Sequence, residues 1–148
     1  MGIVSRNRDL VENWYRALET NDLELFQSVQ NPDVIYDISG HSVISGRHKG
    51  LDVLMTKLLP VVFGGIDQQN FRFCTELKII AEDRNCIVGI MEADGQAVNS
   101  KRYDQRYVHI FEFDGKISRV MEFFDTALAA ETVLADAARV APDGPFQL

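Results

Sequence analysis

A histidine and a glutamate on two neighbouring strand-like segments are the side chains in this sequence best suited to moving a proton. The two segments are joined by Asp114-Gly115, a dipeptide typical of the two-residue turn of a β-hairpin. With these residues in the turn, Tyr107 is expected opposite Glu122, and His109 becomes a diagonal neighbour of Glu122 on the same face. An imidazole and a carboxylate within reach of each other, or of one shared ligand, are the groups used in general acid–base catalysis.

The face that carries this pair is predicted to be aromatic and apolar. Because alternate residues of a strand share a face, one side of the hairpin is expected to hold Tyr103, Gln105, Tyr107, His109, Phe111, Val120, Glu122 and Phe124. Such surroundings favour the protonated form of a carboxylic acid, whereas an imidazole favours the carboxylate, so the pair is expected to exchange protons near neutral pH. In the alternative interpretation, Glu122 and His109 only satisfy each other, or Tyr107, as a structural polar pair.

The opposite face of the hairpin is also substantially apolar and carries Val108, Ile110, Met121 and Phe123. A strand pair that is apolar on both sides has to be covered on both sides. Helices of the same chain would cover one face, and we expect a second copy of the chain to cover the other. The sequence therefore predicts a homodimer.

The elements that position the hairpin are predicted from the hydrophobic period and from turn residues. Helices are expected at 8–18, 21–29, 51–59 and 126–140, a loop at 40–50, and strands at 34–39, 71–80, 86–93, 102–113 and 116–124. This order is typical of an α+β fold in which helices pack on one face of a curved, mostly antiparallel sheet. We expect residues 1–148 to form a single domain, with 141–148 as a loose C-terminal tail.

The composition argues against several classes of function. The chain has 148 residues, a formal net charge of −7 and 46% hydrophobic residues, and a chain of this length can fold around one core without disulfides. Dispersed basic residues argue against nucleic-acid binding, and no apolar run approaches the roughly 20 residues that cross a membrane. Cys74 and Cys86 do not have metal-binding or disulfide spacing. The first residues lack the pattern of a secretory signal, so we expect a cytoplasmic protein.

Four segments in a characteristic order and spacing resemble the SnoaL-like family of polyketide cyclase-like proteins. They are NWYRALETNDLELF, NPDVIYDISG, SGRHKG and YDQRYVHIFEFDGKISRVMEFFDTALA. This family belongs to the nuclear transport factor 2-like superfamily, which also holds ketosteroid isomerase and limonene epoxide hydrolase. The resemblance runs from about Val11 to Leu134. It implies a cone-shaped curved sheet packed with N-terminal helices, which is the nuclear transport factor 2-like or cystatin-like fold.

The resemblance to ketosteroid isomerase does not extend to its catalytic residues. The tyrosine and the acidic residue of its oxyanion hole fall at Trp14 and His109 in this sequence. Its base aspartate falls at Ile38, and Asp37, one residue away, belongs to the opposite face of the strand. Steroid isomerisation is therefore not expected.

The resemblance to other members of the superfamily implies an acidic group in the cone. The tyrosine and the two acidic residues of limonene epoxide hydrolase match Tyr36, Glu92 and Glu122, but its arginine becomes Ile90, so its water-holding network is incomplete. Polyketide cyclases of the SnoaL-like family use an acidic acid–base group in the same cone. Glu122 together with His109 would fill that role.

We therefore expect an enzyme without a metal or an organic cofactor that performs acid–base chemistry, of the isomerase, cyclase or hydrolase type, on an apolar small molecule. The predicted catalytic residues are Glu122 and His109, and the predicted substrate-binding residues are Trp14, Tyr36, Glu92, Tyr107, Phe111 and Phe124. Trp14 could equally be a core residue, and the Tyr36 hydroxyl could contact either a ligand or solvent. The alternative function is a non-catalytic ligand-binding or dimeric association domain.

Overall fold

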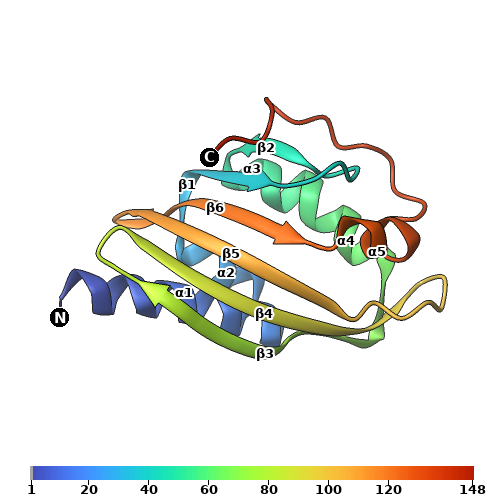
Figure 1. The fold of residues 1–148 in the computed structure, drawn as a ribbon, viewed down its shortest axis with the longest axis horizontal. Helices are drawn as coiled ribbons and strands as arrows, with labels where there is room; N and C mark the ends of the chain where they lie inside the picture. The colour runs from blue at the N-terminus through green and yellow to red at the C-terminus, as the bar shows by residue number, and fades with distance from the viewer. Residues whose placement is uncertain (1) are drawn as a thin grey trace.

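The computed structural model describes residues 2–148, which form a six-stranded sheet and several helices (Figure 1). The helical segments are α1 (Ile3–Thr20), α2 (Leu23–Ser28), α3 (Leu51–Val53), the π-helical turn η1 (Leu54–Leu58), α4 (Leu59–Gly65) and α5 (Thr126–Glu131). The strands are β1 (Gln30–Ile38), β2 (Gly46–Lys49), β3 (Ile66–Glu82), β4 (Cys86–Ala97), β5 (Gln105–Asp114) and β6 (Lys116–Phe124). In this part of the chain, no helix is long and apolar enough to cross a membrane.

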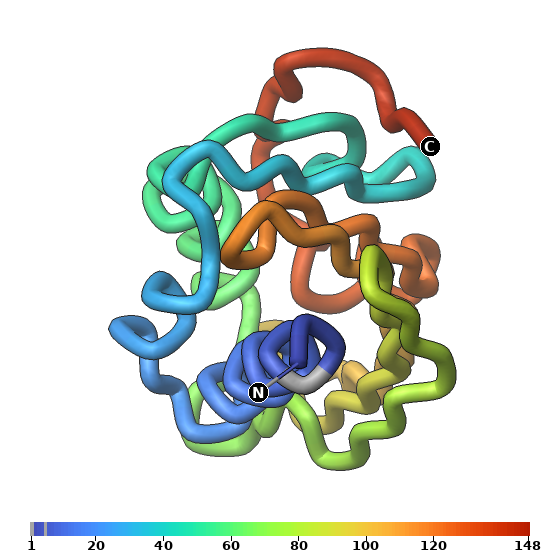
Figure 2. Tube along the Cα trace, turned by 90° about the vertical axis from the view of Figure 1, so that its left-hand side faces the viewer, coloured from blue at the N-terminus to red at the C-terminus, as the bar shows by residue number. Residues whose placement is uncertain are grey.

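The strands lie in the order β2-β1-β6-β5-β4-β3. The neighbours β1 and β6 run parallel, and all other neighbouring strands run antiparallel. Figure 2 shows the sheet bending around α1, so that this helix lies in the hollow of the sheet. These features confirm the predicted α+β fold with a curved, mostly antiparallel sheet.

The bend of the sheet is associated with irregular backbone in β3 and β4. Cys74 has a φ of 56°, a left-handed conformation that is rare for residues other than glycine. The pairing of β3 with β4 shifts between Arg72 and Glu76. Across the pair, Gly95 has a φ of 154°, and a Cβ there would overlap the β3 backbone. Bulges of this kind bend a strand and increase its twist, which helps to form the concave face.

The N-terminal helix buries its apolar stripe in this hollow. Val11, Trp14 and Tyr15 are almost fully buried in the core, as expected for apolar residues at helical spacing. The helix predicted at 8–18 is confirmed and is longer at both ends, from Ile3 to Thr20. It ends at Asn21, whose φ of 55° is typical of a left-handed C-cap.

The helix that begins at Leu51 runs through α3, η1 and α4 and ends at Gly65, beyond the predicted end at residue 59. Pro60 lies in the first turn of α4 and lacks the amide hydrogen that an α-helix interior needs. Just before it, the Leu59 N–H bonds to the Leu54 carbonyl across a π turn. This wider turn accommodates Pro60, so the helix continues instead of ending.

The prediction of a helix at 126–140 is wrong beyond Glu131, where α5 ends. After this residue the chain turns, and Val133 and Leu134 become buried in the core. The Val133 carbonyl packs directly on Gly65, at a position that a Cβ would overlap. Burial of two apolar side chains outweighs the helix propensity of the alanine-rich segment, which is only a weak preference.

Residues 40–50 and 141–148 also differ from the prediction. The expected loop contains β2, an edge strand that pairs with β1. The C-terminal residues have little regular structure, but they are not a loose tail, because they bind the edge of β2. The Arg47 N–H donates to the Gly144 carbonyl at 2.9 Å, and the Asp143 N–H donates to the Arg47 carbonyl at 2.8 Å. The segment thereby covers part of an edge that would otherwise be open to other strands.

A buried carboxylate on the outer side of the sheet helps to hold this C-terminal segment. The Asp37 side chain is fully buried and lies 2.7 Å from Arg47 and 2.8 Å from Arg119. The Gln147 N–H also donates to it, at 3.3 Å. Burial alone would raise the pKa of Asp37, but the hydrogen bonds and positive charges of the two arginines outweigh burial and lower this pKa below its ordinary value.

Candidate active site

The β5–β6 hairpin has the predicted faces but not the predicted register. Gly115 alone occupies the turn, and a β-bulge beside Glu112 shifts the pairing a second time. Each shift moves the partner of a residue by one position. Two shifts together move it by two positions, so each side chain stays on its predicted face. His109 is therefore directly opposite Glu122, and Tyr107 is not its partner.

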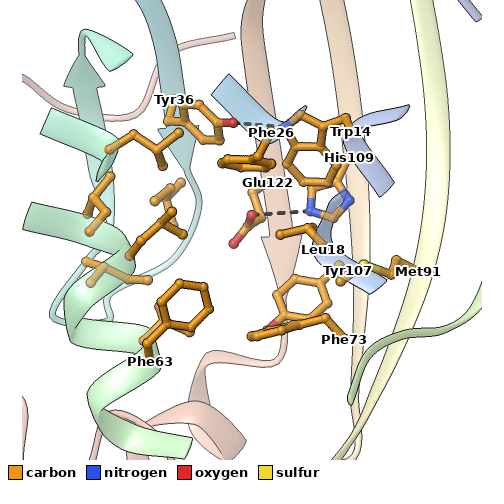
Figure 3. A pocket seen from close by; sticks show the side chains of 16 residues that line it. Trp14, Leu18, Phe26, Tyr36, Phe63, Phe73, Met91, Tyr107, His109 and Glu122 are labelled. Atoms are coloured by element: carbon orange, nitrogen blue, oxygen red, sulfur yellow. Dashed lines mark hydrogen bonds and ion pairs between the residues drawn. The ribbon is translucent and has the colours of Figure 1, made fainter. Parts of the chain in front are cut away.

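A cavity lies between the concave face of the sheet, α1 and the helix formed by α3, η1 and α4 (Figure 3). It is lined by Trp14, Leu18, Phe26, Tyr36, Ile38, Ile44, Leu54, Leu58, Leu59, Val62, Phe63, Phe73, Met91, Tyr107, His109 and Glu122. The cavity has a volume of about 80 Å³, several times the roughly 10–15 Å³ that holds a single water, so it has room for a small ligand.

Glu122 supplies the one carboxylate among the described residues that line the cavity. Its Oε2 atom lies 3.2 Å from Nε2 of His109, and the exposed fractions of the two side chains are 17% and 1%. The second oxygen of Glu122 points into the cavity (Figure 3). The His109 ring is held by the ring of Tyr107, which is stacked on it at 5.6 Å, and by the edge of Trp14 at 4.8 Å. One carboxylate oxygen is thus held by the protein, and the other faces the ligand space.

The cavity is otherwise apolar and carries no positive charge from a lysine or arginine among the described lining residues. An anionic ligand would therefore meet the Glu122 carboxylate without a compensating cation. Within residues 2–148, no group of three or more histidine, cysteine, aspartate or glutamate side chains could hold a metal ion. The arrangement is suited to a neutral, mainly apolar molecule with one polar group at the carboxylate.

The Tyr36 hydroxyl lines the cavity but already has two protein partners. It donates to the Gln30 amide oxygen and accepts from Trp14 Nε1 at 3.1 Å. The Gln30 amide nitrogen in turn donates to the Phe26 carbonyl at 2.8 Å. Burial, the larger effect, raises the pKa of Tyr36, so this hydroxyl stays protonated. Its single hydrogen is committed to Gln30, and Tyr36 therefore acts as part of the wall and not as an acid.

Tyr103 and Tyr107 form a pair of hydrogen-bonded hydroxyls, and the negative charge of Glu122 acts on both of them. The Tyr107 and Tyr103 hydroxyls are 2.7 Å apart, and the Gln105 amide donates to Tyr103 at 3.3 Å. Burial raises the pKa of Tyr103 to about 12 and raises the pKa of Tyr107 well above its ordinary value. Both hydroxyls therefore remain protonated donors at neutral pH. Tyr107 is the member of the pair that reaches the cavity.

Three of the residues predicted to bind substrate do not line the cavity. The prediction that Glu92 binds substrate is wrong, because its side chain is 41% exposed and lies 3.1 Å from Arg106 in a surface ion pair. The pairing of β4 with β5 places Glu92 opposite Arg106, which belongs to the outer face. Phe111 is fully buried behind Trp14, with ring centroids 5.2 Å apart. Phe124 supports the Tyr107 ring at 5.7 Å. The last two pack against cavity residues without reaching the ligand space.

The sequence reasoning missed Tyr15, whose hydroxyl lies 2.9 Å from Nδ1 of His109. The resemblance to ketosteroid isomerase directed attention to the preceding residue, Trp14. The signal that could have identified Tyr15 is its position inside an apolar helical stripe. A buried tyrosine hydroxyl needs a hydrogen-bonding partner, and a strand residue of the aromatic face was available to provide one.

A second hollow adjoins the cavity at the end of α1. Leu18, Phe63 and Phe73 line both spaces. The rings of Phe63 and Phe73 meet edge to face, with centroids 6.1 Å apart. The outer hollow is more polar and includes Glu19 and Arg72. A ligand could therefore pass from the surface to Glu122 by displacing these aromatic side chains.

Comparisons with known proteins identify the fold. No model of a known protein family matches the chain, and no curated protein matches it. A cystatin-like fold protein of unknown function from Xanthomonas campestris is 25% identical, with a TM-score of 0.71 over 86% of this chain and 96% of that protein. A nuclear transport factor 2-like protein of unknown function from Burkholderia pseudomallei is 22% identical, with a TM-score of 0.73 over 90% of this chain and 98% of that protein.

A third similar structure comes from a co-crystallisation with a small molecule. TerC, co-crystallised with polyporic acid, is 20% identical, with a TM-score of 0.71 over 86% of this chain and 97% of TerC. Together these structures show that the chain has the nuclear transport factor 2-like, or cystatin-like, fold. The fold implied by the resemblance to the SnoaL-like family is therefore confirmed.

Proposed function

We propose that this protein is an enzyme that transfers a proton on a neutral, mainly apolar small molecule held in the cavity. Glu122 is the acid–base group, and His109 is its partner. The observation that carries the proposal is the arrangement of the Glu122 carboxylate, which has one oxygen beside His109 and the other facing apolar walls. A carboxylate positioned in this way can accept a proton from a bound molecule and return it.

The step best supported by this geometry is proton removal from a carbon next to a carbonyl group. The free oxygen of Glu122 bonds to the proton, the C–H electron pair forms the enolate double bond, and the carbonyl oxygen takes the negative charge. Return of the proton to another carbon gives an isomer. Attack of the enolate carbon on a second carbonyl gives a ring, and Glu122 then returns its proton to the new alkoxide. In a hydrolysis of an epoxide, the same oxygen would take a proton from water, the water oxygen would bond to a ring carbon as its C–O bond breaks, and Glu122 would return the proton to the new alkoxide.

We assign stabilisation of the developing negative charge to Tyr107. Its hydroxyl can accept a hydrogen bond from Tyr103, 2.7 Å away, and still donate its own hydrogen to a ligand oxygen. A fixed O–H donor aimed at a developing oxyanion is an effective source of catalysis in a cavity that excludes water. His109 would hold the other oxygen of Glu122 in place throughout the proton transfer.

Further support comes from TerC, a protein of similar fold that was co-crystallised with polyporic acid. That structure supports binding of a small organic molecule by this class of fold. The cavity of the present protein has an apolar lining, which favours an apolar substrate. We retain the cytoplasmic location as an expectation from the sequence.

We also propose that two copies associate through the outer face of β5 and β6. Val108 and Ile110 are partly exposed there, next to Met121 and Phe123. Phe146 of the C-terminal segment packs on Phe123 with ring centroids 5.6 Å apart. The C-terminal segment would therefore border the interface.

The second candidate function is ligand binding without reaction. It is favoured by the hydrogen bonding of the cavity, because Glu122, His109 and Tyr36 already have protein partners. A polar network that is satisfied in this way can serve stability alone. This candidate predicts a bound ligand whose chemistry is unchanged by the protein.

Deuterium incorporation from D2O separates the two candidates and does not require the natural substrate to be identified. Purified protein is incubated with small neutral ketones, among them cyclohex-3-enone, and exchange next to the carbonyl is followed by proton NMR. We expect Glu122→Gln to slow exchange about 100-fold or more, in the range of a lost general base. The matched control is Glu92→Gln, because Glu92 lies in a surface ion pair outside the cavity.

The outcomes of this experiment are distinct. Exchange that is lost in Glu122→Gln but retained in Glu92→Gln supports the enzyme. Equal exchange in wild type and Glu122→Gln contradicts the assignment of Glu122. Ligand binding, seen by native mass spectrometry, with no exchange above the buffer rate for any ketone supports the binding function.

A further inference from the structure

We propose that Tyr15 is the positioning residue of this site and that Gly89 provides the space for its hydroxyl. In this proposal Tyr15 donates to His109, which fixes the imidazole tautomer that donates to Glu122. The inference rests on the proposed function for its catalytic meaning. The hydrogen-bonding arrangement itself can be tested without any substrate.

The three side chains form a continuous hydrogen-bonded series. The Tyr15 hydroxyl lies 2.9 Å from Nδ1 of His109, and Nε2 of the same ring lies 3.2 Å from Oε2 of Glu122. Both Tyr15 and His109 are almost completely buried. Because both ring nitrogens have a partner, the imidazole cannot rotate without breaking two hydrogen bonds.

The direction of each hydrogen bond follows from the chemistry of the groups. Burial, the largest effect, raises the pKa of the Tyr15 hydroxyl well above its ordinary value, and the negative charge of Glu122 acts in the same direction. Tyr15 therefore keeps its proton and can donate it. An ionised carboxylate only accepts hydrogen bonds, and a neutral imidazole has one N–H and one free nitrogen. The consistent arrangement is Tyr15 O–H to Nδ1, and Nε2–H to Glu122.

Gly89 is an independent observation that points to the same hydroxyl. It lies directly opposite His109 in the pairing of β4 with β5. A Cβ on Gly89 would overlap the Tyr15 hydroxyl, with the adjacent ring carbons as the next contacts. The φ of Gly89 lies outside the left-handed region, so its backbone conformation does not require a glycine. We infer that a glycine is required because a side chain at this position would overlap Tyr15. A glycine inside a strand often marks such a close approach.

Tyr15 acts through His109, because it is not among the described residues that line the cavity. Without its hydroxyl, Nδ1 would have no partner in a buried site, and the proton could move to either nitrogen. In the Nδ1–H tautomer, Nε2 would present a lone pair to the Glu122 carboxylate. That contact is repulsive, so Glu122 would turn away from His109. The position of Glu122 is therefore set by a residue that never touches the ligand.

The test is the nitrogen-15 NMR spectrum of the histidine side chains at pH 8.5, where imidazoles are ordinarily neutral. The chain has three histidines, and the His109 signals are assigned by their loss in His109→Gln. In the wild type we expect a protonated Nε2 and an unprotonated Nδ1. In Tyr15→Phe and in Gly89→Ala we expect the two shifts to move toward each other, as for a mixture of tautomers. Tyr103→Phe, which removes another buried hydroxyl, should leave them unchanged.

Two results would overturn the proposal. One is a wild-type His109 with a proton on Nδ1, a result that does not depend on how Tyr15→Phe folds. The other is an unchanged Nε2–H tautomer in folded Tyr15→Phe, as judged by circular dichroism. Both are independent of turnover, so they are distinguishable from a failure of the proposed enzyme activity. If turnover is found, Tyr15→Phe should lower kcat with little change in KM.

Discussion

His109 and Glu122 face each other directly across β5 and β6, with 3.2 Å between Nε2 and Oε2. Direct pairing on rigid neighbouring strands holds the two groups more firmly than a contact between loops would. The His109 ring is further fixed by stacking on Tyr107 and by its bond to Tyr15. The carboxylate is thereby held in one orientation before a ligand arrives, which is the requirement for a positioned acid–base group.

The contribution of the His109 N–H to proton transfer by Glu122 can be measured by comparing two substitutions of His109. Glutamine can place an N–H near Oε2, whereas leucine leaves that oxygen without a donor. We expect deuterium exchange in His109→Leu to be slower than in His109→Gln by about tenfold or more, somewhat less than the loss of an oxyanion donor. Equal rates in the two variants would contradict the role given to His109.

Tyr36→Phe should destabilise the protein without removing the acid–base group. The substitution leaves Trp14 Nε1 and the Gln30 amide oxygen without their buried partner. We expect a loss of about 1–3 kcal/mol in the free energy of unfolding, measured by urea denaturation. Exchange activity should be retained in the folded variant. A stable variant without activity would show instead that the Tyr36 hydroxyl contacts the ligand.

The buried carboxylate of Asp37 predicts a loss of stability in acid. Because Arg47 and Arg119 lower the pKa of Asp37 in the folded state, the unfolded state binds a proton more readily. The stabilisation is therefore fully present above the ordinary aspartate pKa of about 3.9 and is lost as the pH falls through the lower folded value. Urea denaturation at pH 7, 4 and 3 should show a smaller acid-induced loss for Asp37→Asn than for wild type.

Asp94→Asn is the matched control for the acid experiment. Asp94 forms an ion pair with Arg102, but its side chain is 45% exposed. Solvent weakens such a pair, so this substitution should change the acid dependence less than Asp37→Asn does. A larger effect at Asp94 would show that burial of Asp37 is not the deciding factor.

Two adjacent glycines at the end of α4 should respond differently to substitution by alanine. A Cβ at Gly65 would overlap the Val133 carbonyl, whereas a Cβ at Gly64 meets nothing within 4 Å. Gly65→Ala should lower the melting temperature by several degrees, because the added methyl group would push α4 away from the segment that follows α5. Gly64→Ala should be neutral or slightly stabilising. Similar melting temperatures for both variants would contradict this packing.

Light scattering at micromolar concentration tests the proposed homodimer. We expect the mass of two chains for the wild type and of one chain for Val108→Glu, because a charge would be buried at the interface. Val98→Glu is the matched control, since Val98 is 60% exposed and lies outside β5 and β6. A monomeric wild type would overturn the prediction.

The sequence by itself determined the class of fold and the faces of the hairpin. Strand side chains alternate with a period of two, so two single-residue shifts left His109 and Glu122 on their predicted face. The β6 prediction of 116–124 matches the observed bounds. Helical spacing likewise identified the buried stripe of α1. These features are local, because each follows from neighbouring residues and elementary backbone geometry.

Only the tertiary structure decided which polar groups meet. The β4–β5 pairing directs Glu92 outward and sets Gly89 opposite His109, and no residue near Glu92 in the sequence encodes that pairing. The bond between Tyr15 and His109 joins residues 94 positions apart. Such contacts depend on the way a helix enters the hollow of a bent sheet. The hydrophobic period of a segment reveals which of its faces is buried. The residue that each buried side chain contacts depends on how the whole chain packs.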